Sequence, residues 1–270
     1  EITWWENLNG DGLSWDEHTI DSNFGGAWGV YAADVDGDDD LDVLGAAPAD
    51  GDITWWENLN GNGLSWDEHL VDGNYTWSHG VYASDVDGDN DIDISGASVD
   101  DKEVTWWENI NGNGLTWTEH IVDDDAYGAV TVQTADMDDD GDLDIIGAVY
   151  YNNDVIWWEN IYGDGTVWNK HIVDGEFGNS HGAFADDIDG DGDLDILGSA
   201  VGDAQMAWWE NQTKSIVPGD FEPDGDVDID DYFVMASSWL DSGISSFRDY
   251  FNRGFQASIV ADMDLPQASS

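Results

Sequence analysis

The sequence predicts an all-β protein built from repeated four-stranded units, and three observations lead to this prediction. A tryptophan pair returns every 51 residues, beginning at Trp4, Trp55, Trp106, Trp157 and Trp208. A fixed period of this size is typical of repeat proteins. Each period contains short β-branched and aromatic runs bounded by Gly, Asn and Asp, which is the pattern of strands and turns. The units show no apolar spacing of the helical kind.

The second unit illustrates how the expected strands follow one another. Strands are expected near residues 81–84, 92–97, 103–109 and 117–122, with an Asn-Gly turn inside 111–114. Residues 1–20 supply the third and fourth strands of a unit, and three complete units follow. The last unit offers three strands, which brings the expected total to 17.

The tryptophan pairs indicate how the units pack. Neighbouring residues of a strand point to opposite faces of the sheet, so both faces of this strand must be covered. Four-stranded antiparallel sheets packed between neighbours form a β-propeller-like array. Stacking of sugar rings on the indoles is the alternative reading, but a fixed place in every unit favours packing. A closed ring of four sheets would use 16 strands and leave one, which could overlap at closure or pair with another molecule.

Other aromatic residues and histidines follow the period. The outer-strand tryptophans are the better candidates for exposed contacts, while Trp28 and Trp77 precede a first strand and could line a pocket. His79 and His181 are two units apart and would face each other in a ring of four. The periodic residues are Trp15, Trp66, Trp117 and Trp168, and four histidines expected to be packed or hydrogen bonded, His18, His69, His120 and His171.

Each unit also carries a loop of alternating aspartates, Asp-x-Asp-Gly-Asp-x-Asp-x-Asp in the first copy. Like charges repel, so solvated acidic turns explain this pattern less well than convergence on Ca²⁺, which takes six to eight oxygen ligands. We expect side-chain ligands from positions one, three, five and nine and a backbone carbonyl from position seven. The candidate residues are Asp34, Asp36, Asp38, Asp40, Asp42, Asp85, Asp87, Asp89, Asp91, Asp93, Asp136, Asp138, Asp140, Asp142, Asp144, Asp187, Asp189, Asp191, Asp193 and Asp195.

The composition limits the possible partners. The 270 residues include 61 Asp and Glu but only 5 Lys and Arg, for a formal net charge of -56. This charge argues against nucleic acid and anionic membrane surfaces as partners. The 17 Trp, 9 Tyr and 8 Phe argue against a disordered chain, and the sequence has no apolar stretch long enough to insert into a membrane.

A different segment follows the repeats. The composition changes at 214–219, which we expect to be a linker, and residues 220–231 fit an EF-hand loop with Gly225 at its sixth position. A helix is expected over 229–240. The candidate ligands are Asp220, Glu222, Asp224, Asp226 and Asp231, which would bring the chain to about five calcium sites.

Residues 1–213 resemble FG-GAP/VCBS repeats, the blades of integrin α-subunit propellers. The resemblance rests on the acidic loops, which are entered through Val-Tyr-Ala-Ala-Asp and left through Leu-Asp-Val-Leu-Gly-Ala in the first copy. It implies that each loop joins the first two strands of a blade and binds calcium. The third copy departs from the pattern because its Gly has moved to Gly141. Residues 220–270 resemble half of a dockerin-type module, for which partner docking and a structural cap both remain open.

The sequence contains no convincing catalytic constellation, because its many carboxylates are already assigned to the loops. We therefore expect a non-enzymatic, secreted protein located outside the cell or on its surface, where weak calcium loops can fill. Its predicted function is that of a calcium-stabilised structural or adhesion module, assembled head-to-tail into a surface filament or layer. The alternative is a lectin-like propeller that binds carbohydrate through exposed tryptophans.

Overall fold

The computed structural model describes residues 1–212, and all 17 expected strands lie within them. The expected linker at 214–219, the EF-hand-like loop and the helix at 229–240 lie outside the described residues. The chain divides into two compact units. The first contains Glu1–Asp186 and Leu194–Glu210, and the second contains Asp187–Asp193 and Asn211–Ser270. Every strand belongs to the first unit.

The strands form five antiparallel sheets, and each sheet consists of strands that are consecutive in the sequence. The first sheet pairs β1 (Ile2–Asn7) with β2 (Trp15–Asp21). Three four-stranded sheets follow, β3 (Gly29–Ala33), β4 (Asp42–Ala47), β5 (Asp52–Asn58) and β6 (Trp66–Asp72); β7 (Ser78–Ser84), β8 (Asp93–Ser98), β9 (Val104–Asn109) and β10 (Trp117–Asp123); β11 (Ala129–Ala135), β12 (Asp144–Val149), β13 (Asp154–Asn160) and β14 (Trp168–Asp174). The last sheet contains β15 (Ser180–Asp186), β16 (Asp195–Ala200) and β17 (Gln205–Trp209).

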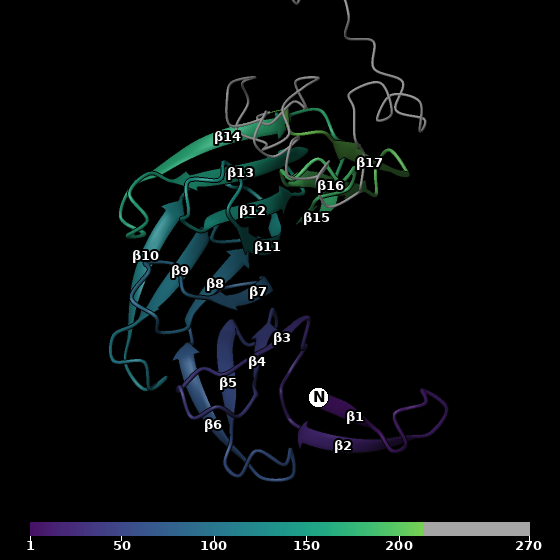
Figure 1. Ribbon diagram of the computed structural model, residues 1–270, viewed down its shortest axis with the longest axis vertical. Helices are drawn as coiled ribbons and strands as arrows, with labels where there is room; N and C mark the ends of the chain where they lie inside the picture. Colours follow the sequence, from purple (N-terminus) through teal and green to yellow (C-terminus); the bar gives the residue numbers. More distant parts are fainter. Residues whose placement is uncertain (213–270) are drawn as a thin grey trace, which may run out of the picture. The chain divides into compact units, whose positions relative to one another are not determined.

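Within the first unit the sheets follow one another in chain order, with β3, β7 and β11 on the inner side of the row and β6, β10 and β14 on the outer side (Figure 1). Strand β7 contacts β3, β4 and β5 of the sheet before it, and β11 contacts β7 and β8 in the same way. Strand β15 continues the series against β11, β12 and β13. The first strand of each of these three sheets therefore packs on the face of the preceding sheet.

The core lies between successive sheets, and the tryptophan pairs supply much of it. Trp55 faces the next sheet and packs with Tyr75, Val81 and Ile94, whereas Trp56 faces the first sheet and packs with Ile2 and Phe24. The equivalent Trp106, Trp107 and Trp158 are also fully buried. This arrangement confirms that the pairs serve packing between sheets, because opposite faces of one strand are covered by different neighbours.

Each of the two terminal sheets exposes the tryptophan that no neighbouring sheet within residues 1–212 covers. Trp5, whose side of the sheet is covered in the middle units, is 56% exposed, and Trp208 at the other end is 43% exposed. Met206 is 80% exposed, whereas Val104 and Val155 at the same place in earlier units are completely buried. Each outer face of the first unit thus keeps the apolar side chains that a further sheet would cover.

A hydrogen bond between sheets recurs with the period. Trp55 Nε1 donates to the carbonyl of Gly114 in the next sheet at 3.0 Å, and Trp106 Nε1 donates to Gly165 at 3.1 Å. Trp4 makes the same bond to Gly63 at 2.9 Å. These glycines lie in the turn between the third and fourth strands. Their positive φ angles disfavour any residue with a side chain, and the nearby indole rings occupy the space that a Cβ would need.

Replacing Gly114 with Ala is expected to destabilise the protein, because an added Cβ would lie 2.3 Å from Cζ2 of Trp55. Gly12→Ala is the matched control, since Gly12 has φ +72° and nothing within 4 Å of an added Cβ. Both variants carry the same left-handed strain. The difference between their free energies of unfolding should be about 1–3 kcal/mol, the usual range for overpacking. Equal destabilisation in denaturant titrations would show that the indole contact does not hold the sheets together.

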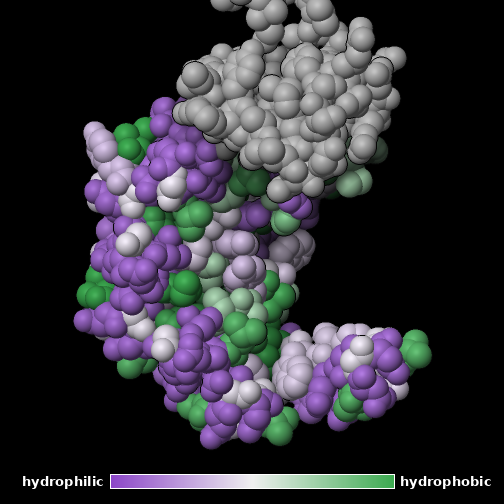
Figure 2. All heavy atoms as spheres, viewed as in Figure 1, coloured by the Kyte–Doolittle hydropathy of each residue, from purple (hydrophilic) through white to green (hydrophobic). Residues whose placement is uncertain are grey.

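The described residues contain no helix that is long and apolar enough to cross a membrane. On the face of the first unit seen in Figure 2, hydrophilic residues cover much of the surface, with hydrophobic residues between them.

Candidate metal centre

The aspartate loops connect the first and second strands of each of the four sheets that follow the β1–β2 pair, as the resemblance implied. Residues four and six of every loop have positive φ, for example Gly37 at 76° and Asp39 at 71° in the first copy. The third copy exchanges the residue types, with Asp139 at 63° and Gly141 at 96°. The displaced glycine therefore occupies the second left-handed position of the loop, and the course of the turn is preserved.

The first aspartate of each loop holds the turn together. The carboxylate of Asp34 accepts backbone N–H bonds from Gly37, Asp38 and Asp39 at 2.9, 3.0 and 2.9 Å. In the fourth loop, Asp187 accepts the N–H groups of Gly190 and Asp191 at 2.7 and 3.1 Å. Such side-chain bonds to the backbone two to five residues later are typical of aspartate-rich turns.

Three carboxylates come together at each of the first three loops. Positions one, three and nine each offer an oxygen, and these oxygens lie within 4.8 Å of one another. Asp38 at position five is outside this set, although its charge helps raise the pKa of Asp42. The groups are Asp34, Asp36 and Asp42; Asp85, Asp87 and Asp93; and Asp136, Asp138 and Asp144.

The aspartate at position nine is the buried member of each group. Asp93 is 1% exposed and accepts N–H bonds from Val86 at 2.9 Å and Asn109 at 2.8 Å. Burial raises the pKa of Asp93 and of Asp144 to about 7, and that of Asp42 to about 6, despite these bonds. Neighbouring loop aspartates add to the increase. A charged carboxylate in this position therefore lacks a compensating positive charge.

The loops also contain buried oxygens without a partner. Oδ1 of Asp36, Asp85 and Asp138 is inaccessible to solvent and accepts no hydrogen bond within residues 1–212. A buried polar atom left unpaired carries a large free-energy cost unless something else satisfies it. Hard oxygen donors gathered around a small space are what a divalent cation such as Ca²⁺ requires. The residues present therefore fit a bound calcium ion.

The sequence did not identify the asparagine that follows each Trp-Trp-Glu run as part of the site. Asn58, Asn109 and Asn160 each donate their backbone N–H to the position-nine aspartate at 2.8 Å. Each side-chain oxygen accepts the N–H of the turn glycine five residues later, such as Gly114 at 3.0 Å. The repeat of Asn at a fixed distance from the loop was the available signal.

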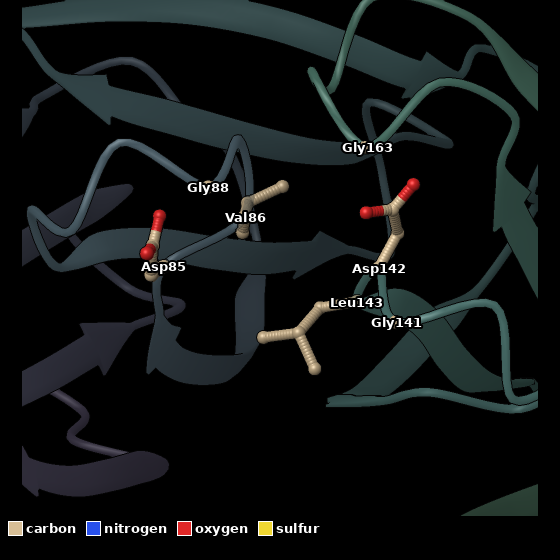
Figure 3. A pocket seen from close by; sticks show the side chains of 7 residues that line it. All are labelled: Asp85, Val86, Gly88, Gly141, Asp142, Leu143 and Gly163. Carbon is tan, nitrogen blue, oxygen red and sulfur yellow. The ribbon is translucent and has the colours of Figure 1, made fainter.

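A pocket of about 210 Å³ lies between the second and third loops (Figure 3). Figure 3 shows Asp85 and Val86 on one side, and Asp142 and Leu143 on the other. The lining residues are Asp85, Val86, Gly88, Gly141, Asp142, Leu143 and Gly163. The pocket is thus bounded by two successive loops and by one turn of the later sheet, and Asp85 belongs both to its lining and to the second carboxylate group.

The periodic histidines are structural, as the sequence predicted. His120 stacks on Trp106 with ring centroids 4.5 Å apart, and its Nε2 lies 2.9 Å from Glu108. His18, His69 and His171 repeat this stacking on Trp4, Trp55 and Trp157. One further group that could hold a metal, Glu57 with Asp67 and His69, belongs to this arrangement. Its histidine is already engaged with Glu57 at 3.2 Å.

The outer-strand tryptophans are more exposed than the buried tryptophans of the middle sheets, such as Trp55 and Trp106, which agrees with their choice as the better candidates for exposed contacts. Trp15 is 55% exposed, whereas Trp66, Trp117 and Trp168 are half-buried, because each of these three packs against a core cluster between two sheets. Trp28 and Trp77 are 59% and 51% exposed. The ring of Trp28 stacks on buried His79, with centroids 4.4 Å apart.

Burial and the nearby His181 lower the pKa of His79. Both ring nitrogens of His79 lack a hydrogen-bond partner among the described residues.

These features define a class of all-β repeat protein whose strand-connecting loops gather carboxylates. A family model of the FG-GAP-like repeat matches residues 85–147 and again 136–198. The chain therefore carries FG-GAP-like repeats, which confirms the resemblance seen in the acidic loops. No curated protein matches the chain. Repeats of this family are typically structural or adhesion modules, often bind calcium and are commonly extracellular.

Proposed function

We propose that this protein is a non-enzymatic extracellular module, structural or adhesive, whose repeats are stabilised by calcium. The observation that carries the proposal is the group of three converging carboxylates, one of them buried with a raised pKa, at each of three successive loops. Loops of this kind fill where calcium is plentiful, which is outside the cell. The proposed role of the ion is to tie the first strand of each sheet to the second.

In each loop the proposed ligands are the side chains at positions one, three, five and nine and the backbone carbonyl of position seven. For the first loop these are Asp34, Asp36, Asp38 and Asp42, with the carbonyl of Asp40. The proposal extends to Asp187–Asp195 and to 220–231, for about five ions in the chain. It keeps residues 1–213 as the repeat region, 214–219 as the linker and 220–270 as a dockerin-like module.

Calorimetric titration of calcium into the chelator-treated protein tests this assignment. Asp36→Asn is expected to lower the number of bound ions by one, because it weakens a ligand whose Oδ1 has no other partner among the described residues. Asp39→Asn is the control, since it removes the same charge from the same loop at a residue outside the carboxylate group. Equal loss of calcium in both variants would indicate a diffuse charge effect. A titration that detects no calcium binding to the wild-type protein would refute the proposed function.

We also propose that the module assembles with copies of itself through the outer faces of its terminal sheets. Trp5 at one end and Met206 and Trp208 at the other are apolar and exposed, whereas the equivalent residues of the middle sheets are buried or half-buried. Strand β17 pairs only with β16 among the described residues, so its other edge offers unpaired backbone groups. Two different surfaces that meet head-to-tail without closing produce a filament.

Sedimentation velocity in calcium tests the assembly. Met206→Lys places a charge on the exposed outer face and is expected to shift the protein towards the monomer without lowering its melting temperature. Val155→Lys, at the buried equivalent position, should instead unfold the repeat. A wild-type protein that stays monomeric at high concentration would contradict assembly, as would polymer that Met206→Lys leaves unchanged.

Carbohydrate binding is the second candidate function, favoured by the exposed rings of Trp28 and Trp77 beside His79. Flat, exposed indoles suit the C–H face of a sugar, and a tryptophan carries a polar N–H as well. A glycan array probed with calcium-loaded protein would reveal such binding. The Trp28→Ala variant should then lose this binding. An array without any bound glycan would reject carbohydrate binding and leave the structural role as the proposed function.

A further inference from the structure

Asn109 and Asn160 connect neighbouring loops as well as serving their own. Each is completely buried at the end of a third strand. The side-chain Nδ2 of Asn109 donates to the carbonyl of Ile92 in its own loop at 3.1 Å. The same Nδ2 also donates to the carbonyl of Val35, in the loop of the preceding sheet, at 2.9 Å. Asn160 repeats the second bond to the carbonyl of Val86 at 3.0 Å.

These bonds form a short path between two carboxylate groups. Asp42 accepts the N–H of Val35 at 3.0 Å, the carbonyl of Val35 accepts Nδ2 of Asn109, and the N–H of Asn109 bonds to Asp93 at 2.8 Å. The position-nine aspartates of the first and second loops are therefore joined through only two intervening residues. A second path of the same kind runs from Asp93 through Val86 and Asn160 to Asp144.

We infer that Asn109 and Asn160 couple calcium binding between successive loops, so that the sites fill cooperatively along the row of sheets. The inference rests on the proposed calcium function. Calcium at Asp93 fixes the carboxylate that holds the backbone of Asn109, and Asn109 in turn holds the peptide of Val35 that positions Asp42. A loop already ordered by its neighbour loses less conformational freedom when it binds its own ion, which gives positive coupling.

Asn58 provides a natural control within the same chain. It makes the local bonds, donating its N–H to Asp42 at 2.8 Å and its Nδ2 to the carbonyl of Leu41 at 3.2 Å. The described residues show no bond from Asn58 to an earlier loop. A substitution at Asn58 therefore removes the local support of a loop without removing a connection between loops.

The test uses hydrogen–deuterium exchange of the full chain, measured by mass spectrometry as calcium is added, because peptides covering each loop report its own midpoint. Asp87→Asn weakens the second loop. In the otherwise wild-type protein, the calcium midpoints of the first and third loops should then both rise by about fivefold or more, the lower range of typical coupling. Adding Asn109→Ala should abolish the shift at the first loop and retain the shift at the third, which Asn160 transmits.

Asn160→Ala should give the converse result, and Asn58→Ala should leave both shifts in place. The two asparagine variants check each other, so the inference stays testable if one of them fails to fold. If Asp87→Asn leaves the calcium midpoints of the first and third loops unchanged, the coupling is overturned while calcium binding itself stands. Absence of calcium-dependent protection in every loop would overturn the proposed function and the coupling together.

Discussion

Removing calcium with excess chelator is expected to lower the melting temperature of this protein sharply. Each of the first three loops brings three carboxylates within 4.8 Å of one another, and one of them is buried. Without an ion, these charges repel in the folded state and separate on unfolding. A ligand that binds only the folded state adds about 2.7 kcal/mol per site when its free concentration is 100 times Kd. Three or more such sites would account for much of the stability of an ordinary domain.

The melting curve should be recovered when calcium is added back in excess over the chelator. Sodium chloride at high concentration is the necessary control, because the net charge of -56 makes the folded chain sensitive to simple screening. Screening should restore only part of the lost stability, since a monovalent ion does not replace the ligand sphere. A melting curve that chelator leaves unchanged would contradict the stabilising role of calcium.

The chelated protein is expected to become more stable as the pH falls from 8 towards 5, the reverse of its calcium-loaded form. The folded-state pKa of Asp42 is about 6 and those of Asp93 and Asp144 about 7, against an ordinary value of 3.8. The folded state therefore binds protons more tightly than the unfolded state. The stability from these three protons is complete below pH 3.8 and is lost as the pH rises through 6 and 7.

The expected size of this effect is on the order of 4 kcal/mol for Asp93 alone, since one pKa unit corresponds to about 1.4 kcal/mol. His79 works in the opposite direction, because its lowered pKa costs stability as it becomes protonated below pH 6.5. In the calcium-loaded protein the ion takes the place of the protons on these carboxylates. The apparent affinity for calcium should therefore fall as the pH drops below about 7.

Denaturant titrations in chelator at several pH values provide the measurement. Asp93→Asn removes the titratable charge, so it should flatten the pH dependence of stability. Its Nδ2 cannot accept one of the two N–H bonds that Asp93 accepts from Val86 and Asn109, so the slope of stability against pH is the quantity to compare. The contrary result is a chelated protein whose stability falls steadily on acidification. That outcome would mean that the position-nine carboxylates are already compensated in the folded state.

The sequence predicted the strand order well because the repeated Trp-Trp pair constrains both faces of one strand. Burial of Trp55 against the next sheet and Trp56 against the previous one follows directly from that alternation. The loops were equally easy to predict from the sequence, since alternating aspartates are a local signal. Even the moved Gly141 is explained locally, because the loop has a second left-handed position to receive it.

The contacts between units were not accessible from the sequence in the same way. The bond from Asn109 to Val35 joins residues 74 positions apart, and that from Trp55 to Gly114 joins residues 59 apart. Neither spacing is a multiple of the repeat, so periodicity alone does not reveal them. The partial burial of the outer tryptophans was hidden for the same reason, since Trp66 packs against a cluster that contains the distant Ile2 and Phe24.

The most direct test of this account is a crystal structure of the protein grown in calcium, with the ions identified by their anomalous scattering. We expect one ion in each of the first three loops, bound by Asp34, Asp36, Asp38 and Asp42 in the first copy and by the equivalent residues in the others. The buried Oδ1 atoms that lack a partner, such as that of Asp36, should lie in the ligand sphere. Loops that remain empty at millimolar calcium, with the same carboxylates still converging, would contradict it.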